Sequence, residues 1–448
     1  MKKAPTGPSR KLGLLSLAAA TYFMVSGGPY GVEELVQDSG YRTALLIIFL
    51  IPLIWALPTA LMVGELSAAL PEEGGFYVWV RRAMGPFWGF QEAWLSLVAS
   101  IFDMAIYPTL FVAYLGRLFP AMTAGWRGIA IAGVLVVICM GWNMFGAKAV
   151  GKSSLVVGIL LLSPFALVTI FALARHLNPV AVPGVKGDLL AGILVGMWNY
   201  MGWDNAATVA NEVENPQRNY PRVMLLALLA IFLSYALPVA AVWSTHIPRD
   251  VWDNGSWAAI ASMVVGPWLG TVLVCTAMLA EFSSFNSLVL SYTHLPVAMA
   301  DDGHLPKIFT RKLKNGAPWV AILVLGTAWL LSLGLKFDRL VMLDILIYGA
   351  SLILEFLALI LLRIREPKLP RPFRVPGGTL GAILIGVMPT GLLIFAAVRN
   401  RTEHLDLGKL GSVSSLSFAL GLMALGVMVY FVMGRPRTEK VEQAAVAD

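Results

Sequence analysis

The stretch SGGPYGVEE, residues 26–34, decides the fold, because it interrupts an apolar run that begins near Leu12. Its glycines favour unwinding and its proline removes a backbone donor, so it is unsuited to a regular membrane helix. Lipid offers no partner for free backbone groups, and non-helical backbone at membrane depth must therefore border protein or a watery cavity. The stretch predicts either a broken helix at a binding cavity or a kinked helix whose glycines permit close packing.

The composition is that of a polytopic membrane protein. Hydrophobic residues make up 58% and charged residues 13% of the 448 positions, whereas soluble domains contain about 45–50% apolar and about 25% charged residues. The basic residues are dispersed among short loops, which argues against nucleic-acid binding despite a pI near 9.4. Cys139 and Cys275 lie far apart in apolar segments and form neither a metal-type spacing nor a disulfide framework.

The apolar pattern predicts twelve membrane-spanning helices, since each segment approaches the roughly 20 residues that a span requires. The expected spans are residues 12–37, 43–69, 88–116, 128–145, 152–174, 188–211, 222–246, 267–293, 318–335, 339–362, 378–398 and 413–433. The amphipathic segment 296–312 predicts a short loop helix. The chain 1–448 is expected to form a single membrane domain with a polar tail over 435–448.

Lys and Arg are unevenly distributed between the predicted loops. With the N-terminus inside, 22 of the 33 Lys and Arg residues fall in inner stretches. The positive-inside rule then predicts a multi-pass protein of the cell (plasma or inner) membrane with both termini in the cytoplasm. The basic N-terminus followed by an apolar run is superficially like a signal peptide, but the many later spans favour a first transmembrane helix.

A second interruption lies in the sixth predicted span, where GMWNYMGWDN occupies residues 196–205. Its Gly202-Trp203-Asp204 echoes Gly31-Val32-Glu33 of the first span. Interrupted spans in corresponding halves indicate an inverted-repeat transporter with a binding site at the midplane, and their helix ends expose amides for a carboxylate and carbonyls for an ammonium group. The expected repeats cover about 12–174 and 188–362, with additional helices over about 378–433.

Acidic residues within the spans lack basic partners. Ionisable residues at this depth are costly and are functional candidates by default. Acids without basic partners suit a cationic substrate, a proton or both. The acids expected in the substrate site are Glu33, Asp103, Asp204 and Glu281, and the candidates for carrying a proton are Glu33, Asp204, Glu281 and Glu355. Glu65 is interpreted as an interfacial gate or a packing acid, and Asp344 is interpreted as structural.

Aromatic residues accompany these acids, namely Tyr30, Tyr107, Trp198, Trp203 and Tyr348. Most membrane aromatics pack or anchor the protein at the interface. A ring beside a desolvated cation adds about 1–2 kcal/mol. Trp203, next to Asp204, is the strongest candidate for such a contact.

Motifs over nearly the whole chain carry a family resemblance. They are Val25–Glu33, Glu73–Val80, Phe87–Glu92, Asp103 with Ala105-Ile106-Tyr107-Pro108, Trp198-Asn199-Tyr200 leading to Trp203-Asp204, Glu212–Pro216 and Gly303–Pro306. The chain resembles the amino acid–polyamine–organocation transporters, and most of all their polyamine uptake and L-type amino acid transporter-like branch.

The resemblance implies an all-α membrane protein with twelve transmembrane helices, a five-plus-five inverted repeat and broken helices 1 and 6. It also implies alternating access and secondary transport with proton symport. By this resemblance the unwound segments bind substrate through Ser26, Gly27, Gly28, Gly31, Trp203 and Asp204, and Asp103, Glu281 and Tyr348 hold its amines. Some proton-coupled relatives carry a lysine midway along span five, whereas this chain has a leucine near Leu161, so a carboxylate would have to carry the proton.

The predicted function is secondary active import of polyamines or amino acids. The number of acids favours polyamines, because a diamine suits carboxylates at both ends, whereas the exposed amides favour amino acids. The alternatives are an amino acid permease or exchanger, and a non-transporting substrate sensor.

An enzyme is not expected, because the five histidines lie in or near loops without metal spacing and no Gly-Lys-Ser/Thr follows the glycine-rich stretch. No catalytic residue, metal or cofactor is predicted. The expected partners are the small amine or amino acid substrate, protons and the lipid bilayer, and the oligomeric state is left open.

Overall fold

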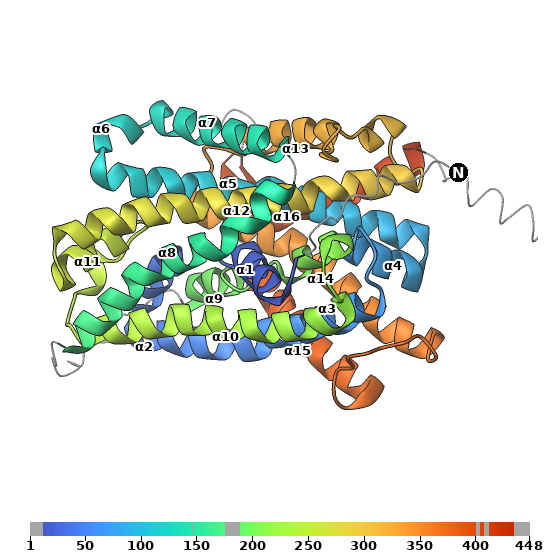
Figure 1. Ribbon diagram of the computed structural model, residues 1–448, viewed down its shortest axis with the longest axis horizontal. Coiled ribbons are helices and arrows are strands. Elements are labelled where there is room, and N and C mark those ends of the chain that lie inside the picture. The colour runs from blue at the N-terminus through green and yellow to red at the C-terminus, as the bar shows by residue number, and fades with distance from the viewer. Residues whose placement is uncertain (1–11, 146, 175–188, 400–403, 407–411, 434–448) are drawn as a thin grey trace, which may run out of the picture.

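The computed structural model describes residues 12–145, 147–174, 189–399, 404–406 and 412–433. Figure 1 shows long helices that run along the longest axis of the molecule. The tail predicted over 435–448 lies outside the described residues.

The chain is almost wholly helical, which confirms the predicted all-α class. The elements of the first half are α1 (Leu14–Val25), α2 (Val32–Ile51), the π-helical turn η1 (Pro52–Ala56), α3 (Leu57–Ala69), α4 (Phe76–Met84), α5 (Pro86–Leu118), α6 (Pro120–Thr123), α7 (Trp126–Asn143) and α8 (Ala147–Ala174).

The second half begins with a short helix and a 3-10 segment. Its elements are α9 (Leu189–Trp198), η2 (Trp203–Glu212), α10 (Pro216–Trp243), η3 (Arg249–Val251), α11 (Trp257–Val264), α12 (Pro267–Asp301), η4 (Lys307–Thr310), α13 (Trp319–Leu331), α14 (Phe337–Arg365), α15 (Gly378–Arg399), the strands β1 (His404–Asp406) and β2 (Ser412–Ser414), and α16 (Ser415–Met433). The two strands form a small antiparallel hairpin, which the sequence pattern did not predict.

Each of the twelve predicted spans contains helix. Within the described residues, nine helices are long and apolar enough to cross a bilayer, and α1 and α13 are shorter apolar helices. One of the nine runs continuously from Val32 to Ala69, although Gly40 (φ 74°, ψ 161°) is non-helical within it. Gly40 therefore marks where the first predicted span gives way to the second.

The loop helix predicted over 296–312 is confirmed only for a short 3-10 helix at Lys307–Thr310. α12 continues through Pro296 to Asp301, and only the short 3-10 turn η4 follows. Val297, Met299 and Ala300 are buried, so apolar packing carries the helix past the proline.

The short helices α1 and α9 lie at the centre of the bundle (Figure 1). α1 packs against α8, α10, α12 and η2, and α9 packs against α2, α14 and α15. The non-helical backbone at their ends is therefore enclosed by protein, as an apolar surrounding requires. Many of the large apolar side chains that are exposed, such as Val137, Ile159, Leu384 and Val432, lie on α7, α8, α15 and α16.

Glu65, near the C-terminal end of α3, connects α3 with α14 and with the segment that follows α14. Its buried carboxylate accepts hydrogen bonds from Arg363 Nε at 2.9 Å and from Val375 N–H at 2.7 Å. Arg371 Nε lies 3.3 Å from the same carboxylate. Of the two interpretations of Glu65, these contacts support a packing acid over an interfacial gate.

Candidate functional site

The first predicted interruption is a break in the helix. α1 ends at Val25, Ser26 is extended (φ −147°, ψ 128°), and α2 begins at Val32. Gly28 and Gly31 have φ values of 100° and 88°, in the left-handed region that glycine adopts most readily. The Ser26 hydroxyl accepts a hydrogen bond from Gly28 N–H at 3.0 Å, so it satisfies one donor that the helix no longer uses.

The second predicted interruption is also a break. α9 ends at Trp198, and Gly202 has a φ of 86° immediately before η2. The two breaks are joined through α10, because the Tyr235 hydroxyl lies 2.6 Å from Ser26 Oγ and 2.9 Å from the Asn199 carbonyl oxygen.

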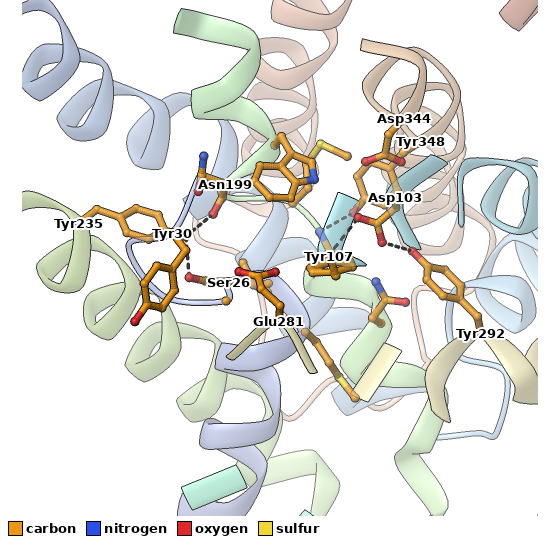
Figure 2. Close-up of a pocket in the computed structure, with 17 residues that line it drawn as sticks. Ser26, Tyr30, Asp103, Tyr107, Asn199, Tyr235, Glu281, Tyr292, Asp344 and Tyr348 are labelled. Carbon is orange, nitrogen blue, oxygen red and sulfur yellow. Dashed lines mark hydrogen bonds between the residues drawn. The ribbon is translucent and has the colours of Figure 1, made fainter. Parts of the chain in front are cut away.

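A pocket lies between the two breaks. Figure 2 shows its side chains converging from the broken segments and from α5, α10, α12 and α14. It is lined by Met24, Val25, Ser26, Gly27, Tyr30, Asp103, Tyr107, Trp198, Asn199, Met201, Gly202, Asn205, Tyr235, Glu281, Tyr292, Asp344 and Tyr348.

Asp103 and Asp344 form one acidic side of this pocket. Tyr107 and Tyr292 donate hydrogen bonds to the two oxygens of Asp103 at 3.1 Å and 3.2 Å. Asp344 interacts electrostatically with Asp103, and Figure 2 shows the two carboxylates near each other. Two acids that interact in this way favour a bound cation between them, because a cation offsets the repulsion of their charged forms.

Glu281 forms a separate acidic side next to the first break. A β carbon added to Gly27 would lie 3.5 Å from Glu281 Oε1 and 3.4 Å from Ser284 Oγ. Glu281 Oε2 and Ser284 Oγ are buried without a hydrogen-bond partner among the described residues. A buried carboxylate oxygen without a donor is costly, so this side of the pocket is suited to a ligand that brings donors.

The titratable acids that line the pocket have no basic counterpart in the part of its wall that the structure describes. Three of its lining residues are carboxylates, and none of the described residues that line it is Lys, Arg or His. Buried charges in proteins are paired or hydrogen-bonded. The pocket therefore has the chemistry to receive a cation with several donors.

The structure brings many of the predicted site residues into the wall of this pocket, namely Ser26, Gly27, Tyr30, Asp103, Tyr107, Trp198, Glu281 and Tyr348. The other predicted residues do not line the pocket. They are Gly28, Gly31, Glu33, Trp203 and Asp204. Trp203 donates its indole N–H to the Tyr200 carbonyl at 2.8 Å and is fully buried, so its ring packs in the core rather than facing the pocket. Gly28 packs against Leu161, because an added β carbon would lie 2.6 Å from that side chain.

Glu33 and Asp204 cap the segments that follow the two breaks. The Glu33 carboxylate accepts hydrogen bonds from Gly31 N–H at 2.6 Å and from the Tyr114 hydroxyl. The Asp204 carboxylate is hydrogen-bonded by its own backbone amide, by the amide of Asn205 and by the Tyr348 hydroxyl at 2.5 Å. Both acids therefore sit where helix amides point, away from the open part of the pocket.

Glu355 lies outside the pocket with a second acid. Both Glu355 oxygens and Glu92 Oε2 are buried without a hydrogen-bond partner among the described residues. Glu355 interacts electrostatically with Glu92 and with Asp204. Ser351 donates a hydrogen bond to the other oxygen of Glu92. Glu355 on α14 and Glu92 on α5 thus link Asp204 to the region between these two helices.

Sequence reasoning missed several residues of the wall: Met24, Val25, Asn199, Met201, Gly202, Asn205, Tyr235, Tyr292 and Asp344. Helix periodicity in the sequence could have identified two of them. Asp344 lies one turn before Tyr348, and Tyr292 lies three turns after Glu281, so each shares a helix face with a predicted residue. Tyr235 carries no comparable signal.

Comparisons with known proteins place these features in a family. The model of a family described as amino acid permease matches residues 12–405. The chain is 31% identical over 423 residues to the polyamine transporter RMV1 of Arabidopsis thaliana, covering 92% of this chain and 84% of that protein. It is 33% identical over 392 residues to the polyamine transporter PUT1 of Oryza sativa subsp. japonica, covering 86% and 73%. It is 26% identical over 398 residues to the serine/threonine exchanger SteT of Bacillus subtilis, covering 84% and 88%.

Proposed function

The chain belongs to the amino acid permease family, and from this membership and the acidic pocket we propose that it is a secondary active transporter that imports polyamines. Permeases of this kind move small molecules across membranes and are not enzymes. The proposed architecture has twelve spans, with inverted repeats over about 12–174 and 188–362, and both termini in the cytoplasm of a plasma or inner membrane. The two breaks on either side of one pocket support this architecture, because interrupted helices mark binding sites in inverted-repeat transporters.

One observation carries the choice of substrate class: three carboxylates and no basic side chain among the described residues line the pocket. An amino acid would bring one negative charge of its own into this acidic surrounding. A polyamine brings only ammonium groups, each with donors for carboxylate and hydroxyl acceptors.

The acids form two sides, which supports a substrate with two amines. Glu281 lies next to Gly27, while Asp103 and Asp344 interact with each other. Tyr107 and Tyr292 hold Asp103 from α5 and α12. In the proposed complex one ammonium group binds at Glu281 and the other between Asp103 and Asp344. Trp198 and the tyrosines of the pocket wall pack along the carbon chain of the polyamine between its two amines.

We further propose that transport follows alternating access with proton symport. Leu161, which packs against Gly28, offers no titratable group at the first break, so the proton would have to be carried by a carboxylate. The candidates are Glu33, Asp204, Glu281 and Glu355. Glu355 is favoured by its interaction with Asp204 and by its two oxygens, which have no hydrogen-bond partner in the part of the chain that the structure describes.

A second candidate function is an amino acid permease or exchanger. The similarity to a protein named as a serine/threonine exchanger favours it. Gly27 at the first break also lines the pocket, and backbone there can receive a substrate carboxylate.

The test is uptake of radiolabelled putrescine into proteoliposomes under an inward proton gradient, with unlabelled spermidine, arginine and leucine as competitors. We expect gradient-dependent uptake that spermidine blocks and leucine does not. Empty liposomes provide the background. Absence of putrescine uptake, together with uptake of a labelled amino acid, would replace the polyamine proposal with the amino acid permease.

A further inference from the structure

The N-terminal ends of α2 and η2 are occupied by carboxylates of the chain itself. At α2, Glu33 is fully buried and accepts from Gly31 N–H at 2.6 Å. The backbone amides of Glu33 and Gly255 and the Tyr114 hydroxyl complete its set of donors. Backbone donors at the start of α2 are thus engaged by a carboxyl group of the chain itself.

The start of η2 is filled in the same way. Asp204 is 2% exposed, and its carboxylate accepts hydrogen bonds from its own backbone amide and from the amide of Asn205. The Tyr348 hydroxyl donates to Asp204 Oδ1 at 2.5 Å, and Gly202 N–H donates to the Tyr348 oxygen at 3.3 Å. A short chain of hydrogen bonds therefore leads from the wall of the pocket to the buried carboxylate.

Both ends border the pocket. Gly202 and Tyr348 line it, and an added β carbon on Gly31 would lie 2.8 Å from the ring of Trp198, which also lines it. A helix N-terminus carries a partial positive charge of roughly half a unit. In transporters with broken helices such ends point at the anionic group of the substrate.

We infer that Glu33 and Asp204 act as internal substitutes for a substrate carboxylate, so that the pocket accepts amines and discriminates against the same amines when they carry a carboxylate. This inference rests on the proposed amine transport. Each of the two ends that could bind an incoming carboxylate already holds a carboxyl group of the chain itself. An amino acid would have to place its carboxylate in a pocket lined by Asp103, Glu281 and Asp344.

Two pairs of probes isolate the carboxylate. Putrescine and ornithine differ by one carboxylate group, and so do cadaverine and lysine. In proteoliposomes containing the full-length protein, the inhibition constants of the four compounds are measured against labelled putrescine. We expect the wild type to prefer each amine over its amino acid, and Glu33→Ser, which vacates the amides, to narrow that preference at least about tenfold. Glu33→Gln, which keeps the volume and removes the charge, should give an intermediate change.

Glu34→Gln is the matched control. Glu34 is the neighbouring acid, and it contacts Asn254 instead of the helix amides, so the ratio of inhibition constants should stay at the wild-type value. An unchanged ratio in both Glu33 variants would overturn the inference while amine transport stood. If Glu33→Ser does not elute as a monodisperse peak, the isosteric Glu33→Gln decides. Lack of putrescine uptake by the wild type would instead refute the proposed function itself.

Discussion

Glu33 and Asp204 occupy equivalent positions, each two residues after a left-handed glycine at the start of a segment that follows a helix break. Gly31 has φ 88° and ψ −11°, and Gly202 has φ 86° and ψ 17°. Each carboxylate turns back onto backbone amides at that start. The three-residue echo in the sequence therefore corresponds to one local geometry that occurs twice in the structure.

The first prediction concerns the glycine of the second break. A β carbon on Gly202 would lie 2.7 Å from the Met24 carbonyl oxygen, which belongs to the backbone and cannot rotate away. We expect Gly202→Ala to reduce putrescine uptake to background and to lower the melting temperature of the purified protein.

Gly40→Ala is the control for this variant. Gly40 also has a positive φ, of 74°, but a β carbon there would meet nothing within 4 Å. The Gly40→Ala protein should lose only the free energy of this backbone strain, about 1–3 kcal/mol at φ 74° and ψ 161°, and should retain uptake. Equal loss of uptake in the two variants would show that the close approach to Met24 is unimportant.

The breaks could be predicted from sequence because their cause is local. Glycine and proline at mid-span are incompatible with a regular helix in lipid, so the positions near Gly28 and Gly202 followed directly. The acids on α5 and α12 could be predicted for a similar reason, since a charge in an apolar segment is conspicuous. The partners of these acids depend on packing between distant helices, and therefore Tyr292 and Tyr235 were missed.

The second prediction concerns Asp344, which the sequence analysis interpreted as structural and which lines the pocket in the structure. We expect Asp344→Asn to raise the KM for putrescine about tenfold, because a charge-assisted hydrogen bond contributes about 1.5–3 kcal/mol. The KM for butylamine, which has one amine, should change less than that for putrescine if Asp344 serves the second amine. An equal change for both compounds would remove Asp344 from the second-amine position.

Asp344 was interpreted as structural because it lies nearer the outer end of its predicted span, and the rotation of the helix was not considered. Placing it in the pocket required knowing that α14 turns the face shared by Asp344 and Tyr348 toward Asp103. Trp203 illustrates the opposite error. It adjoins an acid in sequence, yet the 3-10 geometry of η2 directs its indole N–H to the Tyr200 carbonyl and keeps the ring in the core.

The third prediction concerns the contribution of the buried Glu65 cluster, at the C-terminal end of α3, to the stability of the protein. Glu65 is 0% exposed, and Arg363 and Arg371 are 7% and 5% exposed in their side chains. Removing one partner from a buried ion cluster leaves charge uncompensated and costs about 3–5 kcal/mol. We expect Glu65→Gln to lower the melting temperature in detergent by more than any surface charge variant.

The pair Arg82–Glu366 is the surface comparison. Its side chains are 39% and 32% exposed, and the pKa of Glu366 is lowered chiefly by the hydrogen bond from Arg82. Exposed pairs of this kind contribute about 0–1 kcal/mol, so Glu366→Gln should hardly shift the melting temperature. A comparable loss in both variants would contradict the central role of Glu65.

The fourth prediction is a pH dependence that arises outside the membrane-spanning helices. His304 follows α12 and packs on Phe90 and Tyr430, with ring centroids 5.6 Å and 5.9 Å away. Burial, with a smaller effect of the Arg81 charge, lowers the pKa of His304 to about 4. Since an unfolded histidine titrates near about 6.5, the unfolded state binds more protons between these values, and the stabilising effect of neutral His304 is lost as the pH falls from 6.5 toward 4.

We therefore expect His304→Phe to lessen the fall in melting temperature between pH 7 and pH 4.5. The comparison is between the two pH-dependent falls, so that carboxylates titrating in the same range cancel. The same fall in the wild type and the variant would exclude His304 as a source of acid lability.

The last prediction separates proton coupling from substrate binding. Glu355 has no hydrogen-bond partner for either oxygen among the described residues, and it interacts with Asp204 without lining the pocket. Gln has the same shape but cannot exchange a proton, so Glu355→Gln should retain exchange of labelled for unlabelled putrescine and lose the acceleration of uptake by an inward proton gradient. Glu281→Gln, which alters the pocket wall, should weaken both. Gradient-driven uptake at the wild-type level in Glu355→Gln would assign the coupling proton to another carboxylate, and the order of testing would then be Asp204 followed by Glu33.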